Sequence, residues 1–295
     1  MKTMNLNLLA TFYSVATNNS FSAAAEKLCL SKSVISKHVN QLEYELRCSL
    51  IQRTTRRISL TEEGLFLYER CAEIFDSVDK CYNFIDERKD IVRGKLRVKM
   101  PAVLEFDNGI TNVFAELLST YPELELEIIF DNRIGDLIQE KIDIVLRIGA
   151  LEDSSYRCKK IKNINTYVIA SPEYLSRYGT PQDPFELNKH KCMNYTHCLT
   201  QNRWMFIIDS KQVKIEIAPF LQLESESLLA GYAVKGLGIT TTLDFIAEPY
   251  IESGELVSLL TEFTWKTELY AVYPNNAVIP LKSRKLIDLL APQAL

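Results

Sequence analysis

The first 46 residues carry the apolar periodicity of α-helices. Within residues 6–17 the apolar side chains recur at spacings of three and four, which predicts an amphipathic helix. The polar residues 18–20 end this pattern. Ser22 is placed to cap a second helix and Ser31 to cap a third that continues to about Leu46, because serine hydroxyls accept hydrogen bonds from the free N–H groups of a helix start.

The pattern changes at about residue 50. Residues 50–60 alternate around a polar centre at 54–57, which predicts a short β-hairpin, and Thr61 then opens a long helix. Along that helix, apolar residues recur with the spacing of coiled-coil core positions, and we expect this seam to mediate dimerisation. Its members are Leu67, Cys71, Ile74, Val78, Cys81 and Ile85. The alternative is a single amphipathic helix packed on a domain core, since fewer than four heptads are present.

Beyond Gly94 short apolar strands alternate with helical segments. Strands are expected at 95–100, 124–130, 143–148, 166–171 and 269–273, and helices at 113–121, 135–141 and 230–236. Alternation of this kind is typical of an α/β domain with a mostly parallel sheet and helices on both faces. The chain is therefore expected to contain a small helical domain with a β-hairpin at 1–61, a linker helix at 62–91 and an α/β domain at 92–295.

Composition narrows the class of protein. The chain has 295 residues, of which 47% are hydrophobic and 24% charged, as expected for two or more globular domains. No stretch approaches the ~18 uninterrupted apolar residues of a membrane helix, and the first 21 residues lack the features of a signal peptide. We therefore expect a cytoplasmic protein with no membrane partner. Its seven scattered cysteines are expected to be reduced thiols.

Charge is distributed unevenly along the chain. The first 60 residues carry eight lysines and arginines against three glutamates, a net charge of +5, although the whole chain carries -4. A basic module joined to an acidic body indicates a polyanionic partner for the first segment only.

The third predicted helix separates apolar from polar residues. Ile35, Val39 and Leu42 form the buried side, while hydroxyl, amide and cationic side chains occupy the other. Such groups on the N-terminal half of a helix suit entry into the major groove of double-stranded DNA. The candidate DNA-binding residues here are Ser31, Lys32, Ser33, Ser36, Lys37 and Asn40. Arg53, Arg56 and Arg57, around the hairpin turn, are expected to form a wing along the DNA backbone or minor groove.

This segment resembles the N-terminal domain of LysR-type transcriptional regulators. The resemblance rests on Phe21 to Ala25, Ser36 to Val39, and Leu60 to Gly64, and it continues through 143–151 (DIVLRIGAL), 170–187, 230–239 (AGYAVKGLGI), 252–260 and 269–275. The sequence departs from the family at Lys32, where Gln is usual, and at Ser33, where Pro is frequent. Cys29 occupies a turn position where other helix-turn-helix proteins often have Gly.

The resemblance implies a winged helix-turn-helix, a long linker helix and a periplasmic-binding-protein-like effector domain of two lobes. Lobe I would comprise 92–163 with 268–295, and lobe II 164–267, with a small-molecule effector in the cleft between them. The cleft-lining candidates implied are Pro101, Ala102, Asp131, Arg147, Ile148, Asn202, Ser225, Gly238 and Thr240. A homodimer, a homotetramer assembled through the effector domains, and contact with RNA polymerase are further expectations.

Other chemistries have weaker support. The chain lacks GxxxxGK[ST], and Gly236 to Gly238 lacks the third glycine of a dinucleotide fingerprint, so we expect no enzyme activity, no catalytic residue and no cofactor. The cluster His190, Cys192, His197 and Cys198 fits no familiar zinc spacing, and no metal is expected.

Two binding-protein alternatives remain. A small-molecule-binding protein of periplasmic type without a DNA role would need a signal peptide, which the sequence lacks. An architectural DNA protein without a sensor is disfavoured by the acidic α/β body.

Overall fold

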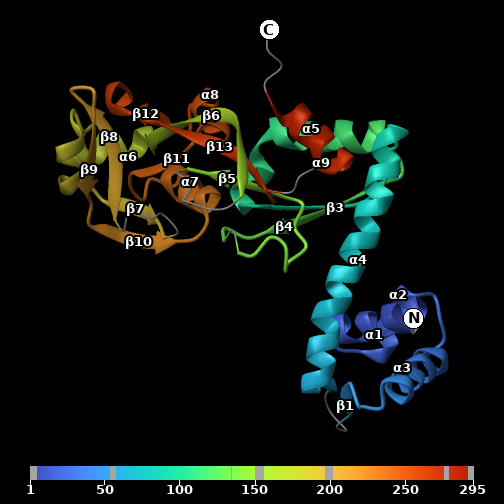
Figure 1. Cartoon of the computed structure of the whole chain (residues 1–295). Coiled ribbons are helices and arrows are strands. Elements are labelled where there is room, and N and C mark those ends of the chain that lie inside the picture. Colours follow the sequence, from blue (N-terminus) through green and yellow to red (C-terminus); the bar gives the residue numbers. More distant parts are fainter. Residues whose placement is uncertain are drawn as a thin grey trace. The chain divides into compact units, whose positions relative to one another are not determined.

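A computed structural model describes residues 5–53, 58–133, 135–149, 156–196, 202–275 and 279–291 (Figure 1). The chain forms two compact units, residues 1–89 and residues 90–295.

The first unit consists of helices and one hairpin. Its elements are α1 (Leu6–Asn18), α2 (Phe21–Lys27), α3 (Lys32–Leu46), β1 (Ile51–Arg53), β2 (Ile58–Leu60) and α4 (Glu62–Arg88). The two short strands pair antiparallel. Ser31 caps α3 as expected, but Ser20 rather than Ser22 caps α2, because the Ser20 hydroxyl accepts the hydrogen bond from the N–H of Ala23. The connection between α2 and α3 contains Cys29, whose φ of 52° is the left-handed conformation that favours glycine.

Helix α4 contributes to the core of this unit with its first half. Phe12, Ile35 and Leu42 are fully buried, and the thiol-bearing Cys71 of α4 is buried among them. Cys71 was expected on a dimer seam, and that expectation is wrong, because the side chain completes the core of its own chain. Leu67 also packs against this core. The single-helix alternative therefore describes the first half of α4.

The second unit contains a seven-stranded mixed sheet (Figure 1). Its strands are β3 (Gly94–Met100), β4 (Leu124–Phe130), β5 (Ile144–Ile148), β6 (Arg157–Ala170), β11 (Thr240–Leu243), β12 (Val257–Leu259) and β13 (Lys266–Tyr273). The order is β11-β6-β13-β5-β3-β4, with β12 also paired to β6. Only β3 pairs in parallel, with β4 and β5, whereas β13, β11 and β12 run antiparallel to their neighbours. The expected mostly parallel sheet is therefore wrong, because the long β6 and the returning β13 run against each other.

The long strand β6 joins two lobes. Its residues 157–165 pair with β13, and its residues 166–169 pair with β11. The first lobe has its own core, which includes Leu96 and Leu146. The second lobe has two apolar clusters, one around Trp204 and one around Leu229. Two half-buried side chains, Val103 and Phe245, pack against the cores of both lobes and so mark the junction.

The remaining elements cover the sheet or extend the second lobe. The helices are η1 (Ala102–Phe106), α5 (Asn108–Thr120), α6 (Pro172–Tyr178), η2 (Pro184–Lys189), α7 (Glu226–Val234), α8 (Asp244–Glu252), η3 (Thr261–Phe263) and α9 (Leu281–Leu290). The strands β7 (Cys192–Tyr195) and β10 (Pro219–Leu223) pair in parallel, and β8 (Arg203–Ile208) and β9 (Lys211–Glu216) form a hairpin. Residues 135–141, expected as a helix, form only turns, and Lys141 ends them with a φ of 54°.

Candidate nucleic-acid interface and interlobe site

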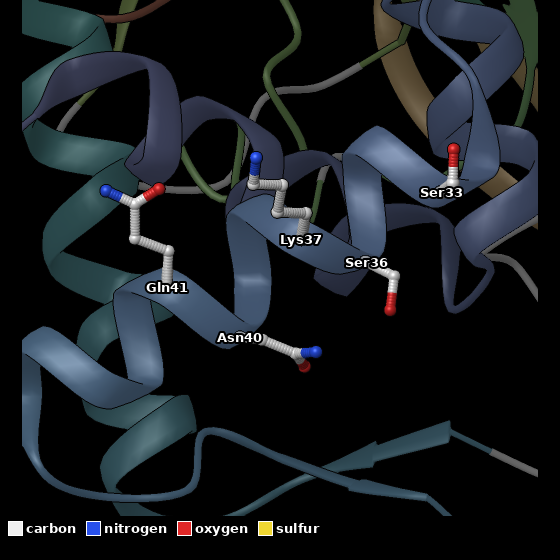
Figure 2. A pocket seen from close by; sticks show the side chains of 5 residues that line it. All are labelled: Ser33, Ser36, Lys37, Asn40 and Gln41. Atoms are coloured by element: carbon white, nitrogen blue, oxygen red, sulfur yellow. The ribbon is translucent and has the colours of Figure 1, made fainter.

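Helix α3 presents a polar face opposite its buried side. Ile35, Val39 and Leu42 are fully buried. The other side carries Ser33, Ser36, Lys37, Asn40 and Gln41, which line a surface hollow of about 640 Å³ (Figure 2). Figure 2 shows all five side chains projecting outward from the helix. The core on one side of α3 therefore fixes the direction of the polar groups on the other.

Local hydrogen bonds orient the two ends of this polar face. The Ser31 hydroxyl accepts from the N–H of Val34 at 3.3 Å and is paired with the hydroxyl of Ser33 at 2.8 Å. At the other end, the amide nitrogen of Gln41 donates to Glu45 at 3.0 Å. Lys32 and Lys37 are exposed and form no ion pair among the residues that the structure describes. They are therefore available to an external anion.

His38 lies outside the polar face. Its Nδ1 is 2.9 Å from the hydroxyl of Thr11 on α1, and Thr11 is buried. The imidazole thus helps to join α3 to α1 and is a packing residue.

The expected wing lies mostly outside the described residues. Arg56 and Arg57 fall there, as does the side chain of Arg53, the last residue of β1. The strands on either side of this segment are held in register by the pairs Ile51–Leu60 and Arg53–Ile58.

The second half of α4 leaves the expected seam exposed. Ile74 and Val78 are each 36% exposed and Ile85 is 48% exposed, and Cys81 is exposed as well. These four residues recur on one side of the helix and have no partner core in the described part of the chain. The first half of the seam, Leu67 and Cys71, therefore packs within its own chain. The second half, Ile74, Val78, Cys81 and Ile85, is uncovered.

A chain of hydrogen bonds crosses the lobe junction. In lobe I the Arg147 guanidinium donates to the main-chain carbonyl of Asn132, and the Asn132 amide donates to the Tyr195 hydroxyl of lobe II at 3.2 Å. The Nε atom of Arg147 is buried and makes no hydrogen bond within the described structure. Asn132 and Tyr195 were not among the sequence candidates, because neither belongs to a motif, and only folding brings the ends of β4 and β7 together.

The other lobe I candidates differ in burial and in their partners. Pro101 is buried before η1, Ala102 is exposed, and Ile148 packs on the core of lobe I, where it is a structural residue. Asp131 forms ion pairs with Arg133 at 3.2 Å and with the buried Lys99 at 3.7 Å. Hydrogen bonds from the backbone N–H and guanidinium of Arg133 lower the pKa of Asp131.

Several lobe II candidates have structural roles instead. The hydroxyl of Thr240, a cleft-lining candidate, is fully buried and donates to the carbonyl of Met193 at 2.9 Å, so that assignment is wrong. A Cβ atom at Gly238 would lie 2.3 Å from the carbonyl oxygen of Lys191, so this glycine is required by close backbone packing. Asn202 accepts a hydrogen bond from Asn194 at 3.1 Å. Ser225 is the half-buried N-cap of α7, and its hydroxyl accepts a hydrogen bond from the N–H of Leu228 at 3.3 Å.

Glu226 is a further polar residue at the junction. It begins α7, and its carboxylate lies 3.5 Å from the Thr242 hydroxyl, next to Leu243, which belongs to the core of lobe I. The residue is half-buried, and its carboxyl group lies on the buried side. Burial raises the pKa of that carboxyl group to about 7. Glu226 was not among the sequence candidates, because a glutamate in the first turn of a helix is a common pattern.

Two residues of the cluster weighed as a zinc site lie within the described part of the chain, and both have other partners. His190 Nδ1 is 3.3 Å from the Tyr174 hydroxyl, and the Cys192 thiol donates to the carbonyl of Leu187. Burial raises the pKa of Cys192 to about 12, so the thiol stays protonated. His197 and Cys198 lie outside the described residues. Within the described ranges, no group of three or more potential metal ligands occurs, and no helix is long and apolar enough to span a bilayer.

Comparison with known proteins agrees with both units. Residues 6–65 match the family of bacterial regulatory helix-turn-helix proteins of the lysR type, and residues 89–294 match the LysR substrate binding domain. The transcriptional regulator CrgA of Neisseria meningitidis serogroup C is 35% identical over 297 residues, with 99% of this chain and 98% of CrgA covered. An uncharacterized helix-turn-helix regulator of Haemophilus influenzae is 34% identical, with 94% and 96% covered.

Solved structures show the same fold over the whole chain. The LysR-type regulator CrgA from Neisseria meningitidis has a TM-score of 0.61 and 32% identity, with 98% of this chain and 99% of CrgA covered. The Vibrio cholerae virulence activator AphB has a TM-score of 0.63 at 24% identity, with 99% and 100% covered, and supports the fold alone. The chain belongs to the LysR family of transcriptional regulators, with an N-terminal helix-turn-helix DNA-binding domain and a C-terminal effector-binding domain.

Proposed function

We propose that this regulator binds a pseudo-palindromic operator as a homodimer in the cytoplasm and that a small molecule bound between the two lobes alters its action. The polar face of α3 is the observation that carries the DNA-binding part of the proposal. Three buried side chains anchor one side of that helix, while the other side presents hydroxyl, amide and ammonium groups. Its relatives are transcriptional regulators, and we propose no enzyme activity.

The DNA contacts proposed divide into two classes. Ser33, Ser36, Lys37 and Asn40 carry donors and acceptors that suit base edges in the major groove. Ser31, Lys32 and the wing residues Arg53, Arg56 and Arg57 would contact the phosphate backbone. The spacing of two half-sites would then follow from the distance between the two α3 helices of a dimer.

We propose that the uncovered half of the α4 seam forms the dimer interface. Replacing Ile74 and Val78 with aspartate would put four repelling charges into that interface, so we expect the double variant to sediment as a monomer. Leu65 is 52% exposed and lies nine residues before Ile74, about half a turn round the helix, so Leu65→Asp is the matched control. An unchanged sedimentation coefficient for the double variant would contradict this interface.

A second surface, on the effector-binding domain, supports assembly beyond a dimer. The edge strand β4 and helix α5 border an apolar hollow of about 370 Å³ that includes Phe114, Leu118 and Ile128. Phe130 beside them is 51% exposed. Apolar surface of this kind is typical of a protein–protein contact. We propose that it joins effector domains of different copies in a tetramer, and that contact with RNA polymerase uses other surfaces.

We propose that the effector binds where Arg147, Asn132 and Tyr195 meet, and that Ser225 at the start of α7 also contacts it. An effector acts only through a difference in its affinity for two arrangements of the assembly, typically equivalent to ~1–3 kcal/mol of coupling. The hydrogen bond between Asn132 and Tyr195 is suited to report binding, because it joins the two lobes whose relative position an effector would change.

Tyr195→Phe tests this assignment. Removing the hydroxyl deletes the bond across the junction, so we expect the variant to bind operator normally but to lose most of its response to any metabolite that thermally stabilises the wild type. Tyr250→Phe on α8 is the matched control. The site is wrongly placed if such a metabolite binds Tyr195→Phe with unchanged affinity and changes its DNA binding as in the wild type.

A further inference from the structure

Helix α3 carries one large side chain that the proposed DNA contacts do not include. Tyr44 is 84% exposed, the highest exposed fraction among the large apolar side chains of the described residues. It follows Ser33 by eleven residues, Lys37 by seven and Asn40 by four. At 100° per residue these intervals place Tyr44 within about 40° of all three, on the side opposite the fully buried Leu42.

Helix geometry places Tyr44 beyond the C-terminal end of the polar face that carries Ser33, Ser36, Lys37 and Asn40. Eleven residues at about 1.5 Å per residue separate Ser33 from Tyr44 by roughly 16 Å along the helix axis. The major groove of B-DNA is about 12 Å wide. With Ser33 and Ser36 at base edges and the helix axis running across the groove, Tyr44 would lie beside the sugar-phosphate strand that borders the groove. A phenolic hydroxyl is one of the groups that commonly donate to phosphate oxygens.

Charged groups flank Tyr44 on both sides. The two neighbouring carboxylates have partners of their own, since Glu43 accepts from the N–H groups of Leu50 and Ile51 at 2.8 and 3.1 Å, and Glu45 accepts from Gln41. Arg47, one turn beyond Tyr44, is exposed and ends the helix. This end of the polar face thus presents a neutral phenolic donor, with one exposed cation nearby and two carboxylates that are held by hydrogen bonds within the chain.

We propose that the Tyr44 hydroxyl donates a hydrogen bond to a backbone phosphate of the operator and so fixes the register of α3 in the major groove. This inference rests on the proposed DNA binding by α3. The contact carries no sequence information, and because tyrosine is neutral it displaces no counterion from the DNA.

The test is a titration of full-length Tyr44→Phe with two labelled duplexes, a cognate operator and its scrambled sequence, at four salt concentrations. We expect affinity to fall about tenfold on both duplexes, the size usual for a lost hydrogen bond to a charged group. The slope of log affinity against log salt should stay at the wild-type value. In Arg53→Ala, which removes a proposed phosphate-binding cation, that slope should fall by about 1. Tyr178→Phe in the second unit, where the tyrosine is 52% exposed, is the matched control.

The other outcomes of this titration contradict the proposed phosphate contact, and each gives a different result. Wild-type affinity of Tyr44→Phe on both duplexes removes the contact. Weakening on the cognate duplex alone assigns Tyr44 to a base, and a changed salt slope assigns the loss to a displaced cation. Failure of the wild type to bind either duplex overturns the proposed DNA binding itself, which distinguishes that failure from the failure of the Tyr44 contact.

Discussion

Replacing Lys37 with alanine is expected to weaken binding to the cognate operator by about 1–3 kcal/mol, the usual cost of losing a contact to a base edge. Lys37 lies in the middle of the polar face of α3, between Ser33 and Gln41 (Figure 2). No carboxylate within the described residues neutralises it, so its ammonium group is available to the DNA. Because a base contact distinguishes sequences, the loss should be greater on the operator than on scrambled DNA.

Fluorescence anisotropy with both duplexes measures this difference. Lys89→Ala removes one positive charge from the end of the first unit and should leave the ratio of the two affinities unchanged. Equal losses on operator and scrambled DNA for Lys37→Ala would reassign Lys37 to the phosphate backbone, and no loss at all would remove it from the interface.

The second unit of the wild type is expected to lose stability as the pH rises from about 4.5 to above 7. Burial raises the pKa of Glu226 from 4.5 to about 7, so between these values the folded state holds a proton that the unfolded state releases. Stability from this source is complete below pH 4.5 and is lost as the pH passes 7. A shift of this size corresponds to at most ~3 kcal/mol, and the accessible part of the side chain reduces that figure.

Glu226→Gln removes the titration while keeping an acceptor for the Thr242 hydroxyl. We expect the variant to be more stable than the wild type at pH 8 and to show a flatter dependence on pH. Urea unfolding followed by tryptophan fluorescence reports on this unit, because both tryptophans, Trp204 and Trp265, lie within it. Glu224→Gln is the matched control. Parallel stability curves for wild type and Glu226→Gln between pH 5 and 8 would show that Glu226 titrates normally.

The first unit was largely predictable because each of its helices is amphipathic and short-range patterns determine it. The period of three and four located α1 and α3, and the burial of Ile35, Val39 and Leu42 necessarily turns Ser33 and Lys37 outward. The same period could not distinguish a seam that packs on its own chain from one that packs on another. Cys71 and Ile74 therefore looked alike in sequence, although Cys71 is buried in the first unit and Ile74 is exposed.

The second unit was less predictable because its features depend on pairing between distant segments. The direction of β13 against β6 is a property of topology, and strand patterns alone do not contain it. The hairpin of β8 and β9 was missed because its turn residues Asp209 and Ser210, with φ of 49° and 61°, are not the usual Asn-Gly pair. Thr240 was misassigned because the family resemblance implied a place in the cleft, whereas its hydroxyl satisfies the buried carbonyl of Met193.

The measurement that tests the account most directly is selection of DNA from the source genome by the purified full-length chain. Fragments retained at moderate salt are sequenced, with the variant Ser33→Ala, Ser36→Ala, Lys37→Ala carried through the same procedure. We predict that the wild type enriches fragments sharing a pseudo-palindromic motif and that the triple variant does not. Retention without a shared motif, or the same motif with wild type and triple variant, would contradict sequence recognition by the polar face of α3.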